Sequence, residues 1–174
     1  MLQTVDHAVI IADPVADGSW QGPGKRIQTD GIHSKDNFNK QNLSADPASL
    51  SEATKLLKAE LLRKIIDTHK MDSALIFVRT KLDADHVEKY LKNLDTVPGV
   101  DAKNIVERAY SCVVLHSDRS QNERRANLIK FKNGEVRFLI CTDVAARGID
   151  IKELPYVISN YCCHYVWYIR PDSI

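Results

Sequence analysis

The sequence predicts an α/β fold, in which helices flank a doubly wound, mostly parallel sheet. The run at residues 73–78 is continuously apolar, which is typical of a strand buried on both faces of a parallel sheet, and the short runs at 111–115 and 135–141 are interpreted as further strands. Stretches with helical spacing of apolar residues separate these runs. Strands that alternate with helices indicate parallel strands joined by helical crossovers.

The N-terminal part predicts one strand and then a long segment without regular structure. Residues 6–12, DHAVIIA, favour a first or edge strand that ends at Asp13-Pro14. Residues 13–48 are rich in Gly, Pro, Asn, Asp and Ser and show no apolar periodicity. We therefore expect an irregular surface segment over residues 13–48.

Three helices follow from capping patterns and apolar spacing. Ser49 and Glu52 match a capping box, and they predict a helix over about residues 51–68. Ser120 and Glu123 match a second capping box, before a basic helix that ends near Asn133-Gly134. Between these two, one helix face is predicted from the spacing of Val87, Tyr90, Leu91 and Leu94. A short helix at 143–148 and a strand at 156–159 complete the predicted order.

Length and composition indicate one domain. With 174 residues and 44% hydrophobic content, we expect a single core over residues 1–160 and an atypical tail at 161–174. The net charge of +1 favours no class of partner, so a nucleic-acid site must come from locally placed groups.

The cysteines and the apolar runs predict where the protein resides. The four cysteines form neither a disulfide framework nor a CxxC pair, and we expect no bound metal. No segment approaches the roughly 20 apolar residues of a membrane span. We expect no membrane association and a place in the nucleus or the cytoplasm.

Ligands of such a sheet bind beyond the carboxyl ends of its strands. Three stretches occupy that position, namely Arg79-Thr80, residues 116–119 and residues 142–150. The last lies in LICTDVAARGIDI, where the Thr142 hydroxyl and N–H groups at a helix start suit a phosphate. Gly148 permits close backbone approach, and the Asp150 carboxylate suits a sugar hydroxyl. The residues alone leave open whether Asp143 and its threonine neighbour merely cap a short helix.

TDVAARGIDI resembles motif V of the DEAD-box RNA helicases. ALIFVRT at 74–80 resembles motif IV, LHSDR at 115–119 is similar to the family's LHGDR element, and Gln121 with Arg124 fits its QxxR pattern. These four elements occur in the family's order, within a resemblance that covers roughly residues 4–160. RIQTDGIHSKDN at 26–37 is similar to a segment of the family member that carries a SPRY insertion.

The resemblance implies the second, C-terminal RecA-like domain of a helicase. It implies an RNA-backbone grip formed by Arg79, Thr80, Gln121, Arg124 and Thr142. It further implies that Gly148 and Asp150 face the nucleotide and that Arg147 couples the two sites. The expected partners are RNA and the first RecA-like domain, with ATP and Mg²⁺ bound only by the two domains together. We expect a monomer.

Two positions depart from the family pattern. Ser117 stands where the family has glycine. After YVISN the family continues to HRxGRxGR, whereas residues 161–174 are YCCHYVWYIRPDSI. An arginine finger for phosphoryl transfer is missing there. We interpret the chain as truncated before motif VI, from an alternative or erroneous gene end, and expect no ATP hydrolysis by the chain alone. The alternative is a non-catalytic module that binds RNA or protein.

Three weaker signals have plain interpretations. QGPGKR at 21–26 lacks the spacing and the Ser or Thr of a P-loop, so we interpret it as a loop. His116 has no nucleophile beside it, which favours a polar residue at a strand end over a general base. The cations Arg125, Lys130 and Lys132 fit a solvated helix face.

Overall fold

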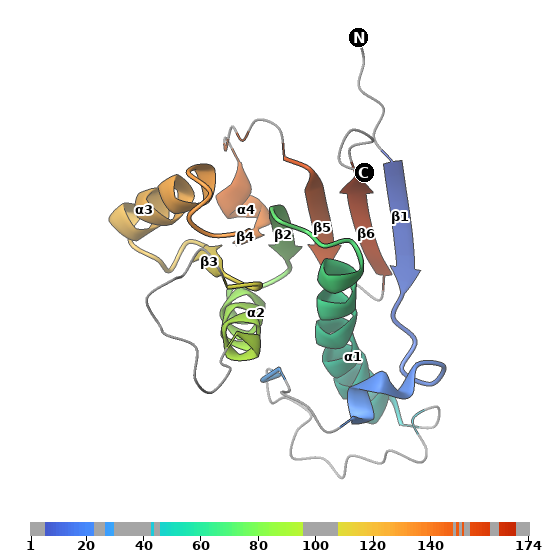
Figure 1. Ribbon diagram of the computed structural model, residues 1–174. Helices are drawn as coiled ribbons and strands as arrows, with labels where there is room; N and C mark the ends of the chain where they lie inside the picture. Colours follow the sequence, from blue (N-terminus) through green and yellow to red (C-terminus); the bar gives the residue numbers. More distant parts are fainter. Residues whose placement is uncertain are drawn as a thin grey trace.

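The computed structural model describes residues 6–22, 27–29, 43, 46–95, 108–147, 149, 151, 154–160 and 164–169, with the backbone alone at 6, 7 and 164–169. Its strands form one sheet in the order β1-β6-β5-β2-β4-β3 (Figure 1). The strands are β1 (Asp6–Ile11), β2 (Ala74–Val78), β3 (Cys112–Leu115), β4 (Phe138–Thr142), β5 (Tyr156–Asn160) and β6 (His164–Ile169).

The four strands β5, β2, β4 and β3 are parallel, which confirms the predicted α/β fold with a mostly parallel sheet. In β4 the first four residues are fully buried. A strand that packs on both faces has no solvent side, which explains the unbroken apolar run at this part of the sequence. The predicted strand began at residue 135, three residues before β4 starts.

The other two strands run in a different way. β6 pairs antiparallel with β5 on one side and antiparallel with β1 on the other. Residues 164–169 therefore belong to the same sheet as the strands before them. The domain boundary at residue 160 stays a prediction. The edge strand predicted at residues 6–12 is confirmed as β1.

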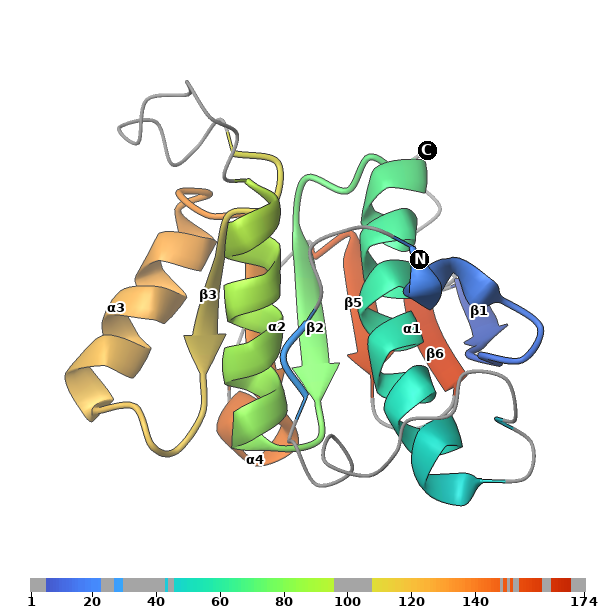
Figure 2. The same cartoon turned by 90° about the horizontal axis from the view of Figure 1, so that it is seen from below.

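Helices cover both faces of the sheet. Side by side on one face lie α1 (Pro47–Thr68) and α2 (Lys81–Leu94), as Figure 2 shows. The other face is covered by α3 (Gln121–Lys132) and the short α4 (Asp143–Ala146). Each pair buries its own apolar cluster against the sheet. Among the described residues, no helix combines the length and apolar character needed to cross a bilayer.

The start of α1 corrects the sequence prediction. Asp46 is the N-cap, because its carboxylate accepts hydrogen bonds from the backbone N–H groups of Ala48 and Ser49, and Pro47 occupies the first turn. The predicted capping box is wrong: Ser49 is inside the helix, and Glu52 is buried and accepts from the Thr29 hydroxyl at 2.6 Å. Proline suits the first helical turn, where its missing N–H has no partner to lose.

Within the segment 13–48, the described residues include a short helix and a buried side chain, which differs from the predicted irregular surface segment. A 3-10 helix, η1 (Gly18–Gln21), places Trp20 in the core with 3% of its surface exposed. The indole N–H of Trp20 donates to the carbonyl of Pro14 at 3.0 Å. Lys64 on α1 pairs with Asp17 at 3.3 Å and ties this turn to the helix.

Cys112 and Cys141, the two cysteines that the structure describes, are buried free thiols. Burial raises the pKa of Cys112 and of Cys141 to about 12, because a thiolate loses its hydration there. The thiolate is the reactive form, so we expect iodoacetamide at pH 8 to alkylate both thiols at least about tenfold more slowly in the folded protein than in urea. Peptide mass spectrometry at these two positions checks this. Equal rates in both solvents would contradict the burial.

Candidate nucleic-acid interface at the carboxyl edge of the sheet

The sheet brings the predicted stretches to one edge. Val78 at the end of β2 pairs with Thr142 of β4 and with Asn160 of β5. Leu115 at the end of β3 pairs with Cys141, directly before Thr142. The residues that follow β2, β3 and β4 therefore lie along a single edge, as expected for parallel strands.

Arg79 and Thr80 follow β2 and have different surroundings. Arg79 is exposed and forms no ion pair within the part of the chain that the structure describes. Thr80 is the N-cap of α2: its hydroxyl accepts from the Asp83 N–H at 3.0 Å and donates to Asp83 Oδ2 at 2.7 Å. Asp83 completes this capping box by accepting from the Thr80 N–H. The sequence signal for this box is Asp83 three residues after Thr80.

The loop between β3 and α3 is held by a buried histidine. His116 Nε2 lies 3.2 Å from Asp85 Oδ1, and His116 Nδ1 accepts from the Asp118 N–H at 3.3 Å. With Nδ1 as the acceptor, Nε2 is the ring nitrogen that donates to Asp85. Arg119 also donates to Asp85, at 2.7 Å. His116 is thus a polar residue that holds the loop against α2, in line with its plain interpretation.

A further ion pair holds the same loop. Lys81 at the start of α2 pairs with Asp118, and this contact lowers the pKa of the Asp118 carboxyl below its ordinary value. The loop ends at Ser120, whose capping box with Glu123 is confirmed. The first turn of α3, which carries the QxxR pattern, therefore begins from a loop anchored to α2.

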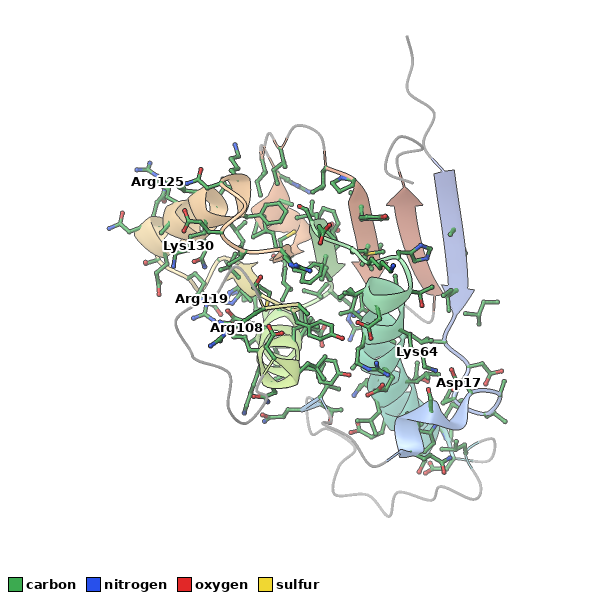
Figure 3. All side chains as sticks on the ribbon, viewed as in Figure 1. Asp17, Lys64, Arg108, Arg119, Arg125 and Lys130 are labelled. Atoms are coloured by element: carbon green, nitrogen blue, oxygen red, sulfur yellow. The ribbon has the colours of Figure 1, made fainter. Side chains whose placement is uncertain are left out.

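The QxxR residues lie on the first turn of α3. Arg124 donates to the side-chain amide oxygen Oε1 of Gln121 at 3.4 Å, a long and weak hydrogen bond that leaves most guanidinium donors available. Farther along α3, Arg125 and Lys130 stand at the margin of the domain (Figure 3). Neither pairs with a carboxylate among the described residues. The solvated-face interpretation of these two stays a prediction.

Thr142 ends β4 and is the N-cap residue of α4, but its side chain makes no capping hydrogen bond. The Thr142 side chain therefore does not cap α4, contrary to the alternative that the sequence left open. Arg147, at the C-terminal end of α4, is exposed. Gly148 and Asp150, the expected nucleotide-facing residues, lie outside the described residues, as do residues 23–26 of the glycine-containing loop.

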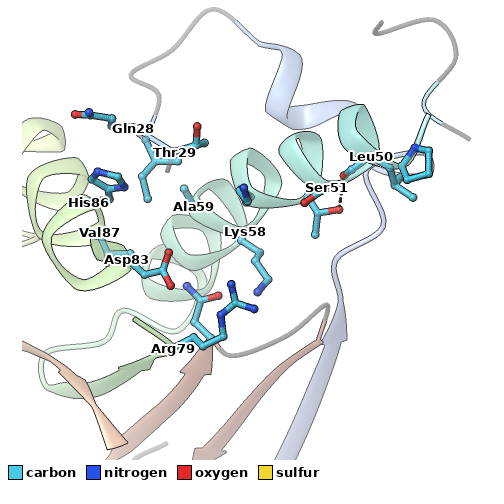
Figure 4. Close-up of a pocket in the computed structure, with 15 residues that line it drawn as sticks. Gln28, Thr29, Leu50, Ser51, Lys58, Ala59, Arg79, Asp83, His86 and Val87 are labelled. Atoms are coloured by element: carbon cyan, nitrogen blue, oxygen red, sulfur yellow. Dashed lines mark hydrogen bonds between the residues drawn. The ribbon is translucent and has the colours of Figure 1, made fainter. Parts of the chain in front are cut away.

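A cavity of about 400 Å³ opens beside Arg79, between α1 and α2 (Figure 4). Its lining includes residues that the sequence did not single out, among them Lys58, His86 and Asn160. They come from α1, α2 and the end of β5. No local sequence pattern marks them, because only the packing of two helices on the sheet brings them together.

Comparison with known proteins identifies the family. The profile described as Helicase conserved C-terminal domain matches residues 57–169. The chain belongs to this family. The match includes every strand from β2 to β6, so the helicase C-terminal domain contains the whole parallel core of the sheet.

Curated relatives match most of this chain, beyond residues 57–169, and the chain is compared with three of them. It is 50% identical over 158 residues to ATP-dependent RNA helicase DDX1 of Xenopus laevis, covering 90% of this chain and 20% of that protein. It is 47% identical over 154 residues to ATP-dependent RNA helicase Ddx1 of Drosophila virilis, covering 88% and 35%. It is 34% identical over 104 residues to DEAD-box ATP-dependent RNA helicase RhpA of Helicobacter pylori (strain B128), covering 60% and 18%.

The chain spans about a fifth to a third of the length of these relatives. The predicted resemblance to the C-terminal RecA-like domain of a DEAD-box helicase is confirmed. The ATP-dependent RNA helicase activity in the names of these relatives is that of proteins several times longer than this chain.

Proposed function

We propose that this chain is the RNA-gripping half of an ATP-dependent RNA helicase of DEAD-box type. The observation that carries the proposal is the carboxyl edge of the sheet, along which Arg79 follows β2, Thr142 ends β4, and the loop after β3 leads to the start of α3. Each position is supplied by a different strand of the parallel core. A strand of RNA laid along this edge would meet donors from all three.

The chemistry of the edge suits a phosphate backbone. Arg79 and Arg124 offer planar groups of N–H donors that match phosphate oxygens, and Gln121 and Thr142 add neutral hydrogen-bonding groups. The Thr80 hydroxyl is committed to the α2 cap, so we assign to Thr80 the placement of α2 beside the backbone. A grip on the backbone alone does not distinguish bases, which a general unwinding motor requires.

We also propose that this chain supplies one edge of an ATP site. Gly148 and Asp150 would supply one edge of the nucleotide site, with Asp150 toward the ribose, and Arg147 would couple that edge to the RNA grip. The first RecA-like domain would supply the remaining groups, including those that hold Mg²⁺. We further propose that the chain acts as a monomer, with RNA and that first domain as its partners, in the nucleus or the cytoplasm.

Arg124→Ala tests the RNA grip. We expect RNA binding that is tolerant of sequence and sensitive to salt, with a log–log slope of about −0.7 per phosphate neutralised on a single strand. Removing one cation should flatten the slope by about 0.7 for unrelated sequences. Fluorescence anisotropy over a salt series measures the change.

Lys70→Ala is the matched control, since it removes the same charge just after α1, before the amino end of β2. Its slope should equal that of the unchanged protein. An Arg124→Ala slope that does not change, or a loss confined to one RNA sequence, would count against the proposed grip.

The alternative function is a non-catalytic module that binds RNA or a protein partner. One observation favours it. Residues 161–174 carry no HRxGRxGR pattern, and the stretch 164–169 forms β6 within the sheet. RNA-stimulated ATP hydrolysis, measured after the chain is mixed with a first RecA-like domain, distinguishes the two functions.

A further inference from the structure

One side of α2 carries charged side chains at helical spacing. Lys81, Asp85 and Glu88 occupy positions i, i+4 and i+7, so they follow one another along a single stripe of the helix, which we call the α2 stripe. α2 packs beside β3 (Figure 2), and the loop after β3 reaches the stripe. Its first contact is the ion pair between Lys81 and Asp118.

The two carboxylates of the α2 stripe meet donors from the same loop. Asp85 accepts from Arg119 at 2.7 Å and lies 3.2 Å from His116 Nε2. Glu88 accepts a longer hydrogen bond from Arg119, at 3.4 Å. The charges of the stripe and of the loop are therefore complementary, and Asp85, with two partners, is the central contact between them.

His116 joins this contact to the backbone of the loop. Its Nδ1 accepts from the Asp118 N–H at 3.3 Å, and its carbonyl oxygen accepts from the Arg119 N–H at 3.2 Å. The imidazole thus binds α2 through Nε2 and fixes the turn through Nδ1. Because the ring is buried, loss of Asp85 would leave Nε2 without its acceptor, and the ring would have to move toward water and release the turn.

The turn determines where α3 starts, whereas the rest of α3 is held by other contacts. The Asn127 side chain donates to the Val114 carbonyl oxygen at 2.9 Å, and Phe131 is buried against the sheet. These contacts hold the body of α3 to β3 without the loop. The α2 stripe therefore fixes the first turn, which carries Gln121 and Arg124, and not the helix as a whole.

We propose that Asp85 is a positioning residue of the RNA grip, through which the α2 stripe holds Arg124 at a fixed separation from Arg79. Arg79 directly precedes α2, so this helix carries one backbone contact at its start and sets the place of the other. Two cations held at a set spacing lose little freedom when they meet two phosphates. Arg119 belongs to this contact and not to a phosphate. The inference rests on the proposed RNA grip.

Asp85→Ala tests the inference through the sign of its effect. If charge alone matters, removing a carboxylate near a phosphate-binding edge strengthens RNA binding, and it also releases Arg119. Positioning predicts the reverse. Affinity for a single-stranded oligouridine should fall at least about fivefold, while the salt slope keeps its value because Arg79 and Arg124 remain. Fluorescence anisotropy over a salt series measures both, and equal or tighter binding would overturn the inference.

Two variants control for charge. Asp85→Asn keeps an acceptor oxygen for His116 and Arg119, so it should bind RNA within about twofold of the unchanged protein. A pure charge effect would be the same in Asp85→Asn and Asp85→Ala, so an equal loss in both would contradict a hydrogen-bonded role. Asp72→Ala removes a carboxylate that lies 3.3 Å from Arg137 at the amino end of the sheet, and RNA affinity should not change.

A double-mutant cycle distinguishes positioning from a general loss of stability. If Asp85 acts through Arg124, Asp85→Ala should cost less than about twofold in RNA affinity in a chain that already carries Arg124→Ala. A structural effect elsewhere would add in full to the loss in Arg124→Ala. Full additivity would therefore refute the positioning role.

Hydrogen exchange tests the hold on the loop without RNA. In the isotope-labelled 174-residue chain, Asp85→Ala should speed exchange of the Asp118 and Glu123 amides at least about fivefold, because their acceptors, His116 Nδ1 and Ser120 Oγ, belong to the loop. Amides late in α3 should keep their rates. Unchanged exchange at both amides would overturn the inference even if the RNA grip is correct. Failure of the grip itself is detected separately, by an unchanged salt slope in Arg124→Ala.

Discussion

The purified 174-residue chain is expected to release no phosphate from ATP at any RNA concentration. Hydrolysis in this class requires a phosphate-cradling P-loop lysine, a carboxylate that holds magnesium and arginines that meet the charge on the γ-phosphate. Residues 1–174 contain no GxxxxGK[ST] pattern and no HRxGRxGR pattern. An arginine finger alone contributes about 10³–10⁵ in rate, so the loss of all three groups leaves no measurable turnover.

Three carboxylates that the structure describes near this edge are engaged in contacts within the domain. Asp83 caps α2 through Thr80, Asp118 pairs with Lys81, and Asp85 binds His116 and Arg119. Releasing any of them to a metal ion would break a contact that holds the edge together. We therefore do not expect these three carboxylates to hold magnesium for hydrolysis.

The measurement is phosphate release with saturating RNA, Mg²⁺ and ATP, beside Asp150→Ala to identify a contaminant. Turnover that survives repurification and falls in Asp150→Ala would refute the prediction. The same assay is then repeated after mixing with a separately expressed first RecA-like domain. RNA-stimulated hydrolysis by the mixture supports the helicase half, whereas RNA binding without hydrolysis supports the non-catalytic module.

Phe138→Ala is expected to destabilise the domain by about 3–5 kcal/mol, which approaches the whole stability of many domains, about 5–15 kcal/mol. Phe138 starts β4, the strand between β2 and β3, and its side chain is fully buried against the cluster under α1 and α2. Truncation removes most of a buried ring and leaves a cavity that the neighbouring helices cannot fill by a small shift. Urea unfolding followed by circular dichroism measures the loss.

Two further variants serve as controls for the loss of stability in Phe138→Ala. Phe138→Leu keeps most of the apolar volume and should cost clearly less than alanine. Val144→Ala on α4 removes a side chain that is 72% exposed, and its effect should stay within about 0.5 kcal/mol. A loss below about 1 kcal/mol for Phe138→Ala would show that β4 does not hold the two layers together.

The sequence by itself determined the parallel core and the order of its elements. β2, β3 and β4 were predicted because strands buried on both faces exclude polar residues, and this leaves a continuous apolar run in the sequence. The start of α3 was predicted because a capping box is a contact between Ser120 and Glu123, three residues apart. Local rules of this kind also place the residues after β2 and β4 at one edge.

Only the tertiary structure decided the features that depend on long-range contacts. Trp20 is buried because η1 docks against α1, and β6 joins the sheet because β5 and β1 each offer it an unpaired edge. His116 and Arg119 both contact Asp85, which lies more than 20 positions earlier in the chain. Lys58 and Arg79, also more than 20 positions apart, line the same cavity. Such contacts leave no local pattern, because their energy comes from the packing of layers and not from neighbours in the chain.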